Sequence, residues 1–156
     1  MYIILVRGVD LWGRLNNHCI TANIRQFILG GKSEFTVLNT VNGIEYKYHI
    51  KSNKEHDTWF VNVKIAGSFQ YAGFIKRNQH NGLYQYARGK KGSMDASNVA
   101  IKGLFWVLNH ADNMNPAVKV IHHGKCACCG KALTDEQSIV RGIGPVCYDR
   151  VMRRGI

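Results

Sequence analysis

The stretch that decides the fold runs from residue 35 to residue 65 and reads FTVLNTVNGIEYKYHIKSNKEHDTWFVNVKI. Apolar and polar residues alternate on both sides of Asn42-Gly43, and this dipeptide between two alternating runs is the strongest short-range signal for a β-hairpin. The alternation resumes at Trp59 and continues to Ile65 after a polar loop. Strands with this period bury one face and leave the other in water.

Working outward, Ala66-Gly67-Ser68 can turn the chain into a further strand over Phe69 to Lys76, which completes a four-stranded antiparallel meander. Before the meander, Ile24, Phe27 and Ile28 share one face of a short helix that Gly30-Gly31 ends. After it, apolar residues from Ala96 to Ala111 recur at helical spacing, with Asp95 as the expected N-cap. They predict one long helix that packs against the sheet.

The fold class that follows is α+β, an antiparallel β-meander with one long packing helix, followed by a small C-terminal module. Four cysteines between residues 126 and 147 give this module the ligand spacing of a zinc ribbon or knuckle. We expect the α+β domain to span residues 1–117 and the zinc-binding module to span 118–156. The run Tyr2 to Val6 has the composition of a strand. It is far short of the roughly 20 apolar residues of a membrane helix and lacks the flanks of a signal peptide, so a cytoplasmic location is expected.

Composition limits the function classes. The chain has 156 residues, of which 46% are hydrophobic and 20% charged, which excludes a disordered or collagen-like protein. Lys and Arg number 21 against 10 acidic residues, a formal charge of +11. This excess excludes a DNA mimic and favours anionic partners, nucleic acid first.

The cysteines point to a metal site. Of the five, Cys126, Cys128, Cys129 and Cys147 fall within 22 residues. An odd number, one tight cluster and the lack of an export signal argue against a disulfide framework and for a reducing compartment. Cys126 and Cys129 form a C-x-x-C pair before Gly130, and Cys147 follows Gly144-Pro145, a typical helix start.

Tetrahedral structural zinc needs a fourth ligand. Either His122 or His123 could reach the ion from the end of a strand, and spacing alone does not separate them. Cys128 is the weakest candidate, because it lies inside the C-x-x-C turn and would have to point away from its neighbours.

The C-terminal segment resembles an uncharacterised zinc-ribbon-like domain family of phage and bacterial proteins. The resemblance rests on 126-CACCGKALT-134, Ser138-Ile139 and 142-GIGPVC-147, about 30 residues. Longer members of that family carry a histidine four residues before the first cysteine, which implies His122 as the fourth ligand. Their β-rich region has strands similar to Trp59-Phe60-Val61 and Tyr71-Ala72-Gly73, so the resemblance could extend over residues 21–150. It implies a small phage accessory protein and no established activity.

A second candidate site lies between Lys76 and Lys91, which is rich in basic residues and tyrosine and contains no acid. Phosphate contacts from the cations and base stacking on the rings would bind nucleic acid. The candidate residues are Lys76, Arg77, Tyr84, Tyr86, Arg88, Lys90 and Lys91.

The leading functional hypothesis is a non-enzymatic phage protein that holds one structural zinc ion and binds nucleic acid or a nucleoprotein complex. The alternative is an inhibitor or adaptor that docks on an acidic host protein, including a defence enzyme. An enzyme ranks third, since no catalytic triad, carboxylate pair or phosphate loop emerges from the sequence.

Overall fold

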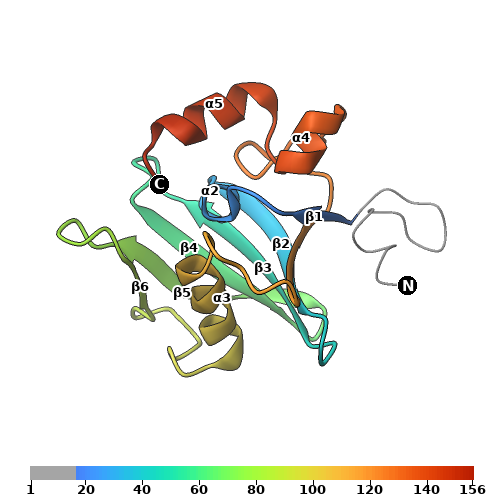
Figure 1. Cartoon of the computed structure of the whole chain (residues 1–156). Helices are drawn as coiled ribbons and strands as arrows, with labels where there is room; N and C mark the ends of the chain where they lie inside the picture. Colours follow the sequence, from blue (N-terminus) through green and yellow to red (C-terminus); the bar gives the residue numbers. More distant parts are fainter. Residues whose placement is uncertain (1–16) are drawn as a thin grey trace.

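Alternating apolar residues form the strands of one seven-stranded antiparallel sheet in the computed structural model, which describes residues 17–156 (Figure 1). The strand expected over Tyr2 to Val6 lies outside the described residues. In chain order the elements are β1 (His18–Ile20), α2 (Ile24–Ile28), β2 (Lys32–Asn39), β3 (Glu45–Ser52), β4 (Thr58–Ile65), β5 (Ser68–Arg77), β6 (Tyr84–Ala87), α3 (Val99–Asn109), β7 (Val118–His122), α4 (Glu136–Arg141) and α5 (Pro145–Arg153).

The predicted meander is confirmed. Strands β2, β3, β4 and β5 are neighbours in that order, and β6 extends the sheet as a hairpin with β5. Phe35 pairs with Tyr48, and Tyr48 pairs with Val63, so one buried row crosses three strands. The rings of Phe35 and Tyr48 stack at 5.2 Å. The period-two pattern of the sequence therefore sets the inner face of the sheet.

Strand β7 is the element that the sequence pattern did not place. It lies between β1 and β2, and its residue Val120 pairs with Ile20 on one side and with Val37 on the other. The predicted boundary at residue 117 assigns β7 to the C-terminal module, whereas its hydrogen bonds belong to the sheet. The cysteine-bearing loop therefore starts directly from the sheet.

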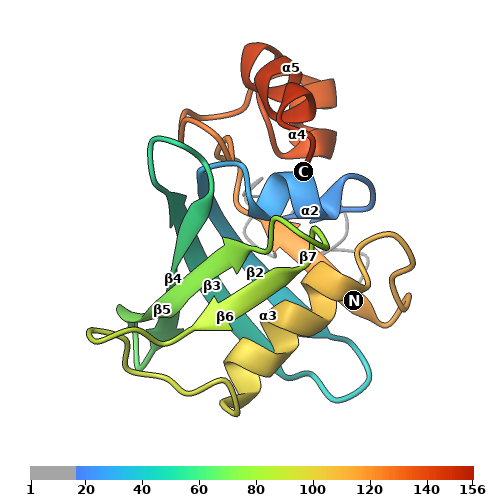
Figure 2. The same ribbon diagram turned by 90° about the vertical axis from the view of Figure 1, so that its left-hand side faces the viewer.

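Helix α3 covers one face of the sheet (Figure 2). It has 11 residues, so the prediction of one long packing helix is not confirmed, and its N-cap is Asn98 rather than Asp95. The Asn98 side chain accepts a hydrogen bond from the backbone N–H of Ala100 at 2.8 Å. Leu104 is among the residues that the helix buries, and the hydroxyl of Tyr48 donates to the carbonyl of Ala100 at 2.7 Å.

The short helix α2 forms where the sequence predicts it. It lies between the sheet and the C-terminal helices (Figures 1 and 2). Ile24, Phe27 and Ile28 are buried. The indole N–H of Trp59 donates to the carbonyl of Leu29 at 3.0 Å, which fixes the end of α2 over β4. Helices α4 and α5 lie beyond α2, at the top of both views (Figures 1 and 2). Within residues 17–156, no helix is long and apolar enough to cross a membrane.

Candidate metal centre

The C-x-x-C pair sits in a tight turn that follows β7. The backbone N–H of Gly130 donates to the carbonyl of Cys126, and the N–H of Cys126 donates to the carbonyl of Lys131. Lys125 and Ala132 form an antiparallel bridge at the base of the turn. This backbone pairing holds Cys126 and Cys129 on the same side of a small knuckle.

The third thiol comes from the first turn of α5, as predicted. Gly144 is the N-cap and Pro145 occupies the first helical position. Proline is tolerated there because the first N–H groups of a helix have no partner within the helix. This start places the Cys147 side chain opposite the knuckle.

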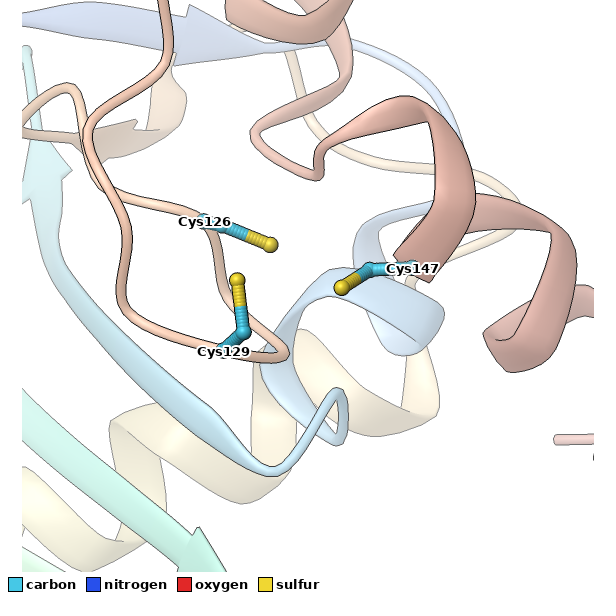
Figure 3. Close-up of side chains that lie close together, drawn as sticks. All are labelled: Cys126, Cys129 and Cys147. Atoms are coloured by element: carbon cyan, nitrogen blue, oxygen red, sulfur yellow. The ribbon is translucent and has the colours of Figure 1, made fainter.

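The three sulfur atoms point toward one another (Figure 3). The sulfurs of Cys126, Cys129 and Cys147 all lie within 4.8 Å of one another, and none forms a disulfide. Zinc–sulfur bonds of about 2.3 Å place tetrahedral thiolates roughly 3.8 Å apart. Sulfurs within 4.8 Å of one another are therefore compatible with a metal ion at their centre.

Backbone amides stabilise the thiolate form of Cys126. Its sulfur accepts hydrogen bonds from the N–H groups of Gly144 at 3.3 Å and of Cys128 at 3.4 Å. Burial raises the pKa of Cys126, but the N–H groups of Gly144, Cys129 and Cys128 outweigh it, so the pKa is lowered overall. Cys126 is consequently prepared to bind a cation.

Cys147 shows the opposite behaviour. Burial raises its pKa, and the nearby thiols of Cys126 and Cys128 raise it further. Several negative thiolates cannot share this site without a positive charge between them. A bound metal ion supplies that charge, because coordination deprotonates a thiol outright.

The structure does not bring either candidate histidine to the three thiols. The Nε2–H of His122 donates to the carbonyl of Ile139 at 2.6 Å, and its Nδ1 accepts from the N–H of Gly124 at 3.0 Å. Both nitrogens of His123 also have partners, Thr36 at 3.2 Å and Asn17 at 3.0 Å. In this arrangement His122 is a buried core residue with no ring nitrogen left for a metal.

His122 should accordingly remain neutral in mildly acidic solution. Burial lowers its pKa to about 4, with smaller contributions from His18 and His123, although the bond to Ile139 opposes the shift. The folded-state pKa lies below the unfolded value, so stability falls as the pH drops from about 6.5 toward 4, by roughly 3 kcal/mol in total.

Imidazole ¹⁵N NMR of the intact protein measures the titration of His122 directly. It therefore separates this titration from the loss of stability that protonation of the cysteine thiols causes at low pH. We expect the Nε2–H tautomer of His122 to persist at pH 5.5. A scalar coupling between ¹¹³Cd and a His122 nitrogen in the cadmium-substituted protein would instead make His122 a ligand.

Cys128, the weakest candidate ligand by its spacing, is not among the three clustered thiols. Its thiol lies within interaction range of the Cys147 thiol and accepts a long contact of 3.9 Å from the Arg154 guanidinium. The sequence signal was the adjacent pair Cys128-Cys129, but the direction of each side chain in the turn depends on backbone angles that spacing does not give. Cys128 therefore belongs to the surroundings of the candidate site.

The structure places the second candidate site on and after β5. The five basic side chains of this site, Lys76, Arg77, Arg88, Lys90 and Lys91, are all exposed. Arg88 forms an ion pair with Asp95 at 2.9 Å and donates to the carbonyl of Gly92, so part of its role is to hold the loop.

The two tyrosines of that site face inward. The Tyr86 hydroxyl donates to the carbonyls of Ala72 and Met94, both at 2.7 Å, and its ring lies edge-on to Phe105. The Tyr84 ring lies edge-on to Trp59 at 5.7 Å. In this placement both rings pack against the core and are not offered to a nucleic acid.

The comparison with protein families concerns the C-terminal segment. Residues 121–151 match a family of unknown function (DUF6011). The match covers 31 of the 156 residues and contains the three clustered cysteines. No curated protein and no solved structure matches the chain.

Proposed function

We propose that the protein is a non-enzymatic nucleic-acid-binding protein whose C-terminal segment is held together by one structural zinc ion. We further propose that it acts in the cytoplasm of a bacterial host as a phage accessory protein. The observation that carries the binding function is the positive charge that, within residues 17–156, is mostly without carboxylate partners.

Zinc is the metal that the donor set favours. Three thiolates from a knuckle and a helix start are typical of closed structural zinc sites. Cys126, Cys129 and Cys147 would hold the ion, and the positive charge would relieve the repulsion that raises the pKa of Cys147. The ion would contribute folding energy rather than catalysis.

The fourth coordination position is best assigned to Cys128. Its thiol is already beside that of Cys147, whereas both nitrogens of His122 have backbone partners. With Cys128 as the fourth ligand, the ion would be held by four thiolates. Soft thiolate ligands also explain a preference for zinc over magnesium or calcium.

The charge distribution supports an anionic partner. Within residues 17–156 the ion pairs are Arg25–Asp112, Arg88–Asp95 and Arg153–Asp149. Lys90 and Lys91 are exposed and adjacent in a loop that belongs to no strand or helix. Unpaired cations on an exposed loop lower the free energy of phosphate binding in a salt-dependent way.

Replacing Lys90 and Lys91 together with glutamine should flatten the slope of log affinity against log salt. Each lost phosphate contact reduces the slope by roughly 0.7–0.9, so the double variant should lose about 1.4–1.8. Fluorescence anisotropy with a labelled oligonucleotide at several salt concentrations measures the slope. All oligonucleotide sequences should weaken alike, because phosphate contacts do not read bases.

The matched control is Lys54→Gln with Lys102→Gln, two exposed lysines on the loop after β3 and on α3. This pair removes the same net charge and should change the slope little. Equal slopes for both double variants would show that Lys90 and Lys91 make no phosphate contact. A wild-type protein that binds neither DNA nor RNA at low salt would remove the nucleic-acid function and favour an acidic protein partner.

A further inference from the structure

The face of the sheet opposite α3 carries aromatic rings where a solvent-facing sheet normally carries polar residues. Phe60 on β4 pairs with Phe74 on β5, and Lys64 pairs with Phe69. Between these rows Asn62 pairs with Tyr71. Along β4, Phe60, Asn62 and Lys64 alternate with the buried residues Trp59, Val61 and Val63, so they point away from the core. Their partners on β5 lie on the same face.

The rings on this outer face remain accessible. Phe60 is 39% exposed and Phe69 is 37% exposed, while Tyr71 and Phe74 are half-buried. Phe60 and Tyr71 lie 6.4 Å apart with their planes tilted by 49°. Mutual contact therefore covers only part of each ring, and contiguous exposed rings of this kind are typical of interaction surfaces.

Lysines lie among these rings. The Nζ of Lys64 is 5.8 Å from the centroid of Phe69, and the Nζ of Lys76 is 5.8 Å from that of Phe74. On the neighbouring strand, Lys51 pairs with Phe60. The acids beside this surface include Glu34, which pairs with His49, and Asp57, which interacts electrostatically with Lys76. Burial lowers the pKa of His49, and Lys51 lowers it further, while Glu34 opposes the shift.

The chemistry of this surface selects its partner. Cations interleaved with flat exposed rings match a ligand that carries negative charge at every unit and planar π-systems between the charges. Single-stranded nucleic acid has both, and its bases are free to stack, whereas a duplex hides the base faces. Phe69 pairs with Lys64, which is four residues from Phe60 along β4, so the two exposed rings are about 13 Å apart along the strand and can take different bases.

We propose that the outer face of β3, β4 and β5 is a binding site for single-stranded nucleic acid, with Phe60 and Phe69 as stacking platforms and Lys51, Lys64 and Lys76 as phosphate contacts. Other RNA-binding modules use an open antiparallel sheet with exposed aromatics in the same way. A Cβ built on Gly89 would be 2.9 Å from the Phe74 ring, which shows that the Gly89 backbone packs against this ring. The loop with Lys90 and Lys91 is therefore continuous with the proposed site.

This site rests on the proposed nucleic-acid function and names where and in which form the nucleic acid binds. The test uses the full chain and fluorescently labelled oligonucleotides, a 15-nucleotide single strand and the duplex of the same sequence. Stacking on one ring contributes about 1–3 kcal/mol per base, which corresponds to about 5- to 150-fold in affinity. Phe60→Ala and Phe69→Ala should each weaken single-strand binding by a factor in this range and leave the salt slope unchanged.

Two matched controls separate the outer face from general effects. Leu83→Ala removes an exposed apolar side chain, 57% exposed, away from this face and should leave binding within twofold. Lys64→Gln should flatten the salt slope by about 0.7, whereas Lys102→Gln on α3 should not. Thermal melts establish that every variant is folded, which is expected because the replaced rings are exposed.

The possible results distinguish a failure of the proposed outer-face site from a failure of the proposed nucleic-acid function. Single-strand binding that survives Phe60→Ala and Phe69→Ala unchanged overturns the proposed site and leaves nucleic-acid binding intact. Tighter binding of the duplex than of the single strand also overturns it. Lack of wild-type binding to any nucleic acid removes both proposals, and a wild-type dimer dissolved by Phe60→Ala would show that this face binds a second copy of the chain instead.

Discussion

Replacing Cys126 with serine is expected to abolish metal binding and to unfold the C-terminal segment. Structural zinc in comparable small sites contributes about 10–16 kcal/mol at neutral pH, most of it as folding energy. Cys126 is the thiol with the most amide partners, so its loss removes both a ligand and the organising centre of the knuckle. Elemental analysis should fall from one zinc per chain to none, with loss of the native thermal transition of this segment.

Two further substitutions complete this experiment. Cys19→Ser alters a half-buried thiol on β1 and should retain the metal. Cys128→Ser should retain cobalt but weaken its thiolate charge-transfer band by about a quarter, the share of one thiolate in the four ligands of a tetrahedral site. Full metal content and unchanged melting of the Cys126→Ser protein would refute the metal site, and an unchanged cobalt band in Cys128→Ser would refute the fourth ligand.

Replacing Gly142 with alanine should produce the second large effect. Gly142 follows α4 with φ of +72°, and a Cβ there would be 2.5 Å from Cε2 of Phe27 and 2.8 Å from Cδ1 of Ile20. The left-handed conformation costs about 1–2 kcal/mol for alanine, and forcing a methyl into a packed core adds about 1–3 kcal/mol. We therefore expect urea unfolding to show that the free energy of unfolding falls by about 2–5 kcal/mol.

Gly67→Ala separates the two contributions. Gly67 also has positive φ, +89°, but nothing lies within 4 Å of its added Cβ. Gly67→Ala should therefore lose only the part of the free energy of unfolding that comes from the left-handed backbone conformation. Equal losses for both variants would mean that the contact between Gly142 and Phe27 does not restrict this position, and that the C-terminal segment packs on α2 more loosely than the structure indicates.

Much of the sheet could be predicted from the sequence, because each strand of the meander pairs with a neighbour in the chain. The alternation around Asn42-Gly43 and from Trp59 to Ile65 is sufficient to define which side chains are buried. Strand β7 could not be placed in this way. Its partners β1 and β2 precede it by 79 residues or more, and the pattern of a short strand does not identify a distant partner.

The three clustered cysteines could be predicted from local sequence signals, whereas the positions of the other candidate residues depend on distant parts of the chain. The C-x-x-C pair and the Gly144-Pro145 helix start are local signals, and they predicted three thiols that the structure brings together. The directions of His122, Cys128, Tyr84 and Tyr86 depend on neighbours that only folding supplies. The carbonyl of Ile139 accepts a hydrogen bond from His122, and the carbonyls of Ala72 and Met94 accept hydrogen bonds from Tyr86.

By itself the sequence determined the meander, the basic character of the protein and the three clustered thiols, because local periodicity, charge and ligand spacing are properties of the chain. Only the tertiary structure decided which rings reach solvent. Tyr84 and Tyr86 alternate with Gln85 and turn toward Trp59 and Phe105, whereas Phe60 and Phe69 turn away from the core. A strand pattern defines two faces, but the helix that packs on one of them determines which face is left exposed to solvent.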